Sequence, residues 1–185
     1  MKKLLLLFSL ILSACSPSVT SMLSINSDLS NVPVKEKNIY YELKDSSVIA
    51  ARINRVIRQR LKETGWTIHT DPKSANYSYS ITTDKKEFVQ NYLSNIGGTT
   101  YLTQQRESFP ISFFIIQNAI TKENIYEAAI VLSSNYEFGA LEKFTKVAAP
   151  ALFLKEDKKW DIECETIYPE NQKEYESCFL KISNE

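Results

Sequence analysis

The residues whose chemistry is most clearly indicated by their surroundings lie near the start of the chain, around Cys15. Two lysines directly after the first residue provide positive charge, and an apolar run of eleven residues, 4–14, follows them. This run is too short to span a bilayer as a helix, and it ends in the small residues Ser13 and Ala14. The pattern predicts an export signal that covers residues 1–14 and is cleaved before Cys15.

The four residues Leu12, Ser13, Ala14 and Cys15 resemble the lipobox of bacterial lipoproteins. The resemblance implies a thioether-linked diacylglycerol on Cys15 and N-acylation, typically with palmitate, of the new N-terminus. Ser16, in place of Asp after the cysteine, implies by the rule of the same family that the protein passes to the outer membrane. The alternative is an ordinary secretory signal with a cysteine at its end by chance. We expect a lipid-anchored protein whose domain lies in the periplasm or at the cell surface.

The two other cysteines, Cys164 and Cys178, form an even pair once Cys15 carries lipid. Export places them in a compartment that permits disulfides, and they enclose a polar segment with few apolar residues. A bridge over a loop of this size would stabilise the fold by roughly 3 kcal/mol. Two separate buried thiols are the alternative. Because no other Cys or His lies at ligand spacing, we expect no metal site.

Catalytic chemistry has little support in the sequence. His69 is the only histidine, and it is expected on a short strand, pointing away from Trp66 and Ile68. The chain contains no Gly-x-Ser-x-Gly elbow, phosphate-binding loop or HExxH motif. The acidic pair Glu163 and Glu165 is expected to be solvated. We therefore expect neither an enzyme nor a cofactor.

Charge and helical spacing define one candidate binding surface. Removing residues 1–14 leaves 20 basic and 22 acidic residues, a balance that does not suit a nucleic-acid binder. Residues 47–64 have the spacing of an amphipathic helix that ends at Gly65. Its polar side carries four basic residues, Arg52, Arg55, Arg58 and Lys62. Arg60 lies on the apolar side, where we expect it to pair with a carboxylate. This basic stripe is either a solvated face or a docking surface for lipid headgroups or an acidic partner.

The remaining elements are expected from period and turn residues. Strands are expected at 38–43, 66–70, 77–82 and 160–162, and a central hairpin from 111–116 and 124–133. Helices are expected at 88–96 and 137–154, while 101–109 fits either a strand or a loop. Tyr77 and Tyr79 share one strand face and form a second candidate partner or ligand surface.

Together these elements predict an α+β fold, a two-layer sandwich with helices on one face of a mostly antiparallel sheet. The expected division is a signal peptide at 1–14, a lipidated N-terminus and flexible linker at 15–36, the α+β domain at 37–163, and a C-terminal tail at 164–185 stapled by the disulfide.

One further resemblance involves the body of the protein. The segment 39–77, with its helix, Gly65, the Asp71-Pro72 turn and the Ala-x-Tyr ending at Tyr77, resembles the N-terminal half of the conjugal surface-exclusion, or complement-resistance, outer-membrane lipoproteins (TraT). Similar layouts occur in other small envelope lipoproteins. That family has a Gly/Ala-rich apolar hairpin after this region, whereas here Gly97-Gly98 is followed by polar threonines. The resemblance therefore implies the lipid site and the fold, and does not extend to membrane penetration or ring assembly.

These features favour a non-catalytic, lipid-anchored envelope protein that binds another envelope protein, as an assembly accessory or a surface-exclusion-like factor. The alternative is a periplasmic lipoprotein that binds a small ligand or glycan through the aromatic face of its sheet. A deep cavity lined by Tyr77, Tyr79 or Tyr101, with convergent polar groups, would favour the alternative. A flat, polar sheet face or an exposed sheet edge would favour protein binding.

Overall fold

The protein is described by a computed structural model, in which residues 18–96, 99–133, 136–154, 158–167 and 175–183 can be described. Its centre is a mixed eight-stranded sheet in the order β3-β2-β4-β5-β6-β1-β7-β8. The strands are β1 Ser18–Ser27, β2 Asn38–Tyr41, β3 Thr67–His69, β4 Tyr77–Ile96, β5 Thr99–Asn118, β6 Asn124–Leu132, β7 Lys158–Ile167 and β8 Tyr175–Ile182. The pairings β2–β3 and β2–β4 are parallel and the other five are antiparallel.

Two α-helices, α2 Val48–Glu63 and α3 Leu141–Ala148, accompany the sheet. Short 3-10 turns lie at Leu29–Asn31, Val34–Glu36, Pro72–Ser74, Phe138–Ala140 and Ala149–Ala151. Within the described residues, no helix is long and apolar enough to cross a membrane. The expected α+β composition is confirmed at this level.

Helix α2 begins and ends where its sequence signals place it. The Ser47 hydroxyl accepts a hydrogen bond from the Ala50 amide at 3.0 Å, which caps the N-terminus. Gly65 has a φ of 87°, a left-handed conformation that costs a glycine little. The Trp66 amide then bonds the Leu61 carbonyl at 3.0 Å, and the Gly65 amide bonds the Lys62 carbonyl at 3.0 Å. These two bonds form a Schellman motif, which turns the chain back toward the sheet as β3.

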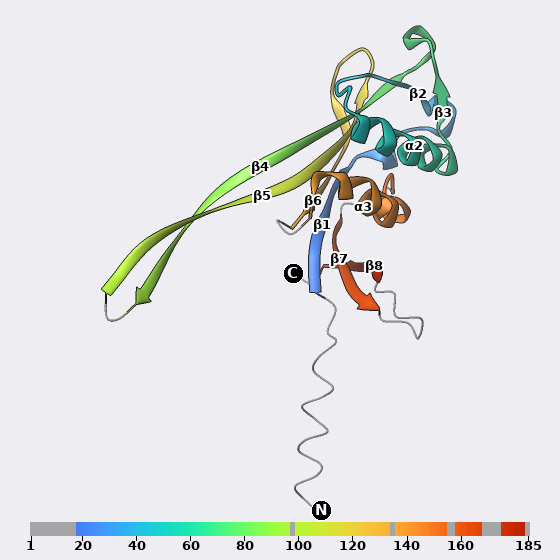
Figure 1. Cartoon of the computed structure of the whole chain (residues 1–185). Coiled ribbons are helices and arrows are strands. Elements are labelled where there is room, and N and C mark those ends of the chain that lie inside the picture. The colour runs from blue at the N-terminus through green and yellow to red at the C-terminus, as the bar shows by residue number, and fades with distance from the viewer. Residues whose placement is uncertain (1–17, 97–98, 134–135, 155–157, 168–174, 184–185) are drawn as a thin grey trace, which may run out of the picture.

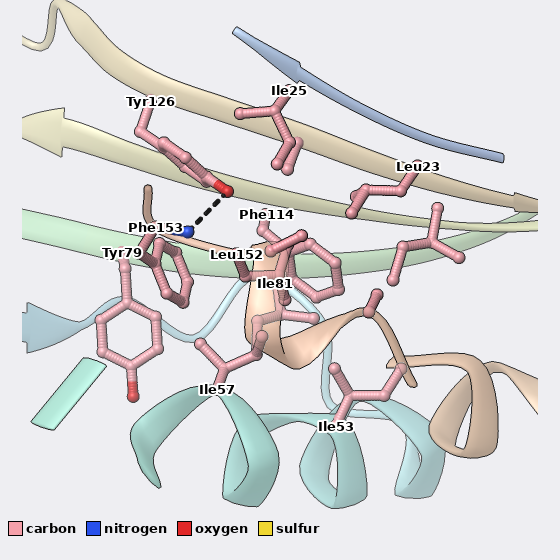
Figure 2. Packing of buried hydrophobic residues seen from close by; sticks show 14 of the residues in the cluster. Leu23, Ile25, Ile53, Ile57, Tyr79, Ile81, Phe114, Tyr126, Leu152 and Phe153 are labelled. Carbon is pink, nitrogen blue, oxygen red and sulfur yellow. Dashed lines mark hydrogen bonds between the residues drawn. The ribbon is translucent and has the colours of Figure 1, made fainter. Parts of the chain in front are cut away.

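The core lies between α2, α3 and one face of the sheet (Figure 2). Ile53 and Ile57 of α2 face strand residues that recur at every second position, among them Leu23 and Ile25 of β1. The expected shared face of Tyr77, Tyr79 and Ile81 is confirmed, and this face is buried under α2: Tyr77, Tyr79, Ile81, Phe114, Ile116, Ile130 and Leu132 all belong to the core.

The expected helix at 88–96 is wrong, because this segment is part of β4. It pairs residue by residue with β5, from Tyr77 opposite Asn118 to Ile96 opposite Thr99. The helical spacing of its apolar residues is overridden by this long antiparallel pairing. The undecided segment 101–109 is strand.

The expected linker at 15–36 and the separate tail at 164–185 also differ from the structure. Strand β1 pairs with both β6 and β7, so that residues 18–27 lie inside the sheet. Although this strand is rich in serine, its apolar residues Leu23 and Ile25 alternate with polar ones and are buried in the core. Strands β7 and β8 likewise continue the sheet at its edge. The described parts of both segments therefore belong to the domain.

Candidate functional site

The two cysteines of the C-terminal region are joined as expected. Cys164 of β7 and Cys178 of β8 lie directly opposite each other, with an S–S distance of 2.01 Å. Cys15 lies outside the described residues. The disulfide attaches the edge strand β8 to β7.

Glu163 differs from its expected solvated state. Its side chain is buried, and one carboxylate oxygen accepts a hydrogen bond from Lys181 Nζ at 3.0 Å. This ion pair joins β7 to β8 beside the disulfide. A buried carboxylate with a cationic partner in adjacent strands has a structural role.

The basic stripe of α2 lies at the surface. Arg52, Arg55, Arg58 and Lys62 are exposed, and the first two line an open groove of about 480 Å³ between α2 and α3. Glu142 of α3 lies in this groove, 2.7 Å from Lys146 and 3.8 Å from Arg52. The hydrogen bond from Lys146, aided by the charges of Lys146, Arg52 and Arg55, holds the pKa of Glu142 below its ordinary value. Part of the stripe is thus neutralised by α3.

Arg60 does pair with a carboxylate, as expected, and it has a second role. Its Nη1 lies 3.3 Å from Glu63 Oε2. In addition, Nη2 donates to the Pro150 carbonyl at 2.8 Å and Nε donates to the Leu152 carbonyl at 3.2 Å. Arg60 therefore fastens the segment after α3 to α2.

Tyr77 and Tyr79 do not form a binding surface, because α2 and the loop after it cover them. The Tyr79 hydroxyl donates to Asn54 Oδ1 at 2.8 Å, and Tyr77 packs edge-on against Trp66 at 5.5 Å between ring centroids. Burial raises the pKa of both phenols. Tyr77 lines an open hollow of about 620 Å³. Because Tyr77 is only 8% exposed and Tyr79 only 2% exposed, neither ring supplies the aromatic platform that a glycan would need.

Among the residues that the structure describes, no group of three or more His, Cys, Asp or Glu side chains could hold a metal ion. His69 lies on β3, where its Nε2 is 3.2 Å from the Asn38 side-chain oxygen. This contact joins two neighbouring strands.

The most prominent surface feature was not expected from the sequence: a long two-stranded arm (Figure 1). It consists of residues 85–96 of β4 and 99–110 of β5, paired from Lys85 opposite Pro110 onward. At about 3.3 Å per residue the arm is about 40 Å long. Pro110 lacks an amide hydrogen, and the pairing of β5 with β6 ends directly beside it, at Ile111.

Among the strands that the structure describes, none pairs with the arm from outside, and the arm exposes apolar side chains. In the body, β4 pairs with β2 only at 77–79 and β5 pairs with β6 only at 111–117. Val89 is 53% exposed and Leu102 is 65% exposed. Leu102 pairs with residue 93, four positions beyond Val89, so the two lie on the same face of the arm.

At the base of the arm, three apolar residues lie on the sheet face opposite the helices. Phe113 and Ile115 alternate with buried core residues of β5, and Ala129 lies beside them on β6. These three residues line an open hollow of about 210 Å³, together with the polar residues Ser24, Asn26 and Glu127. The arm and this hollow form one candidate contact surface.

No family model matches the chain, and no curated protein sequence matches it. Among solved structures, a PDZ domain protein from Parabacteroides distasonis is similar with a TM-score of 0.51 at 9% identity, over 80% of this chain and 41% of that one. The chain thus spans less than half of that protein. The PelC dodecamer from Paraburkholderia phytofirmans has a TM-score of 0.40 at 13% identity, over 70% of this chain and 96% of that one. The first likeness concerns the fold alone.

Proposed function

We propose that this chain is a non-catalytic, lipid-anchored protein of the bacterial outer membrane that acts by binding another envelope protein, as an assembly accessory or a surface-exclusion-like factor. Acyl chains on Cys15 hold it to the membrane, and residues 15–17 lead directly into β1. The helices form one layer of a two-layer domain and the sheet the other. The lipobox pattern supports the anchor.

The observation that carries the proposal is the arm. An isolated two-stranded hairpin is marginally stable in water. The described residues add no third strand to this ribbon, so a partner strand would stabilise it. Unpaired strand edges bind extended segments of other proteins by strand addition, with the side chains on each face giving specificity. The exposed apolar pair Val89 and Leu102 provides such side chains.

The test is photocrosslinking in intact envelopes. A photoreactive phenylalanine analogue is placed at Leu102 in the arm or at Val34, which is 81% exposed in the body. We expect a reproducible protein adduct from position 102 and none from position 34. Recovery of no protein adduct from position 102 would contradict the proposal.

A matched pair of variants shows whether the arm itself binds. Val89→Asp combined with Leu102→Asp should remove the adduct of an analogue placed at Lys86 on the arm, because a carboxylate is costly to bury against an apolar partner. Val34→Asp should leave the adduct unchanged. All three side chains are exposed, so the variants should keep the stability of the parent.

Isopycnic fractionation that finds the protein wholly in the inner membrane would refute the proposed location.

A further inference from the structure

The sheet edge formed by β8 has an apolar groove, here named the β8 groove. Pro150, Ala151 and Leu154 form one side, and Trp160, Phe179 and Leu180 form the other. Its volume is about 360 Å³. Phe179 is 40% exposed, and Leu154 is also exposed to solvent. Apolar side chains that stay open to water along a groove of this kind favour an apolar occupant.

Both sides of the β8 groove are held in place by specific bonds. The disulfide from Cys164 fixes Cys178, which also lines the groove. On the other side, Arg60 binds the carbonyls of Pro150 and Leu152, at 2.8 and 3.2 Å. The groove is therefore formed before any occupant arrives, and the occupant does not have to order its walls.

The lipid site of the chain is within reach of this groove. Ser18, at the start of β1, pairs with Cys164, whose disulfide partner Cys178 lines the groove. Strands β1 and β8 are separated only by β7, so their backbones lie about 10 Å apart. Cys15 precedes Ser18 by three residues, which span about 10 Å when extended. Three residues are therefore long enough to bridge the distance between Ser18 and β8.

We propose that one acyl chain carried by Cys15 lies in the β8 groove. This inference rests on the lipidation that is part of the proposed function. Each methylene gains about 0.8 kcal/mol on leaving water, whether it enters a bilayer or an apolar groove. Of the three chains that the lipobox implies, two remain for the membrane, and two chains suffice for stable anchoring. The third chain fixes the β7–β8 end of the domain beside the anchor.

The test uses the full-length protein in its own envelope. Cells are supplied with palmitate that carries a diazirine in its chain, the cells are irradiated, and peptides of the purified protein are analysed by mass spectrometry. We expect the lipid on Cys15 to crosslink to the same chain, at peptides containing residues 147–154 or 178–180.

Two variants of exposed apolar residues provide the comparison. Phe179→Asp should lower the yield of this intrachain crosslink about tenfold or more, because it places a carboxylate against chain methylenes. Ile120→Asp should leave the yield unchanged, since Ile120 is 90% exposed in the turn between β5 and β6. Equal urea midpoints of the two variants exclude unfolding as the cause of a lower yield.

The outcomes separate the two proposals. Lipid on Cys15 that crosslinks only to membrane lipid, or to another protein, overturns the acyl-chain site and leaves the proposed function standing. A Cys15 peptide without lipid overturns the acyl-chain site together with the anchor. An undiminished crosslink in Phe179→Asp also overturns the acyl-chain site.

Discussion

At the scale of single residues, Asp45 connects the start of α2 to β4. One carboxylate oxygen accepts a hydrogen bond from the Ser47 amide at 2.8 Å, and the other accepts from the Thr83 amide at 2.9 Å and from the Thr83 hydroxyl. Burial raises the pKa of Asp45, but the hydrogen bonds from Thr83 and Ser47 outweigh it, so that the pKa lies below its ordinary value. The ionised carboxylate therefore stabilises the fold at neutral pH.

The stabilisation by Asp45 should depend on pH. Because the folded-state pKa is lowered, the contribution is present above the unfolded pKa of about 4 and is lost as the pH falls through the folded pKa. We expect Asp45→Asn to lower the free energy of unfolding by about 1–2 kcal/mol at pH 7, and by less at pH 3. Urea unfolding at both pH values measures this. The exposed Asp84→Asn is the control, and an equal loss at both pH values would contradict the account.

Tyr126, on β6 of the sheet, contacts the segment that follows α3. Its hydroxyl oxygen accepts a hydrogen bond from the Phe153 amide at 3.0 Å, and its ring lies 4.9 Å from that of Phe153, between centroids. Phe153 has a left-handed φ of 60°, and its amide nitrogen faces the Tyr126 hydroxyl (Figure 2). Tyr126→Phe leaves the buried amide without an acceptor and should lower the free energy of unfolding by about 1–3 kcal/mol. Unchanged urea unfolding would show that the amide finds another acceptor.

At the scale of elements, β8 depends on the disulfide because it is an edge strand. The bridge closes a loop with a sequence separation of 14, for which a stabilisation of about 3 kcal/mol is expected. Cys164→Ser combined with Cys178→Ser should lower the free energy of unfolding by this amount. Reductant should bring the wild-type protein to the same urea midpoint and leave the double variant unaffected. A wild-type midpoint that does not respond to reduction would refute this role.

The elements also show which parts of the fold can be predicted from sequence. Helix α2 was predicted because its signals are local: a capping serine, an apolar face and Gly65 all lie within one segment. The arm was missed because the apolar spacing of 88–96 fits a helix, while the pairing that makes it a strand is with residues 99–107. Strand β1 was missed because serines conceal the alternation of Leu23 and Ile25, and only its place between β6 and β7 makes it a strand.

The candidate site, like the fold, could be predicted from sequence only where its signals are local. The pairing of Cys164 with Cys178 is predictable from the even number of cysteines that remains if Cys15 carries lipid and from the expected export. The exposure of the basic stripe is predictable from the helical period. The shared face of Tyr77 and Tyr79 was predicted correctly, but its burial depends on where α2 packs, which is a tertiary property. No local signal distinguishes an exposed strand pair from an internal one, so the arm had to be seen in the structure.

At the scale of the whole molecule, the proposed function separates attachment from recognition. In this proposal attachment depends on Cys15, since the chain without residues 1–14 is slightly acidic and would gain little from anionic lipids. Recognition depends on the arm. A domain with this division of roles should fold without its lipid, because its described core is formed by residues from β1 onward.

Cys15→Ser tests that division directly. We expect a soluble domain that still unfolds cooperatively in urea, because the substitution changes no residue of the described core. Its free energy of unfolding should fall below that of the lipidated protein only by what the acyl chain in the β8 groove contributes. Partner adducts in the envelope should fall to background, since the arm no longer stands beside the membrane where its partner lies. Adding the purified soluble domain to envelopes at high concentration should restore some adduct, because the arm itself is intact. A variant that gives full adduct yield at its normal cellular level would show that the anchor has no part in the function.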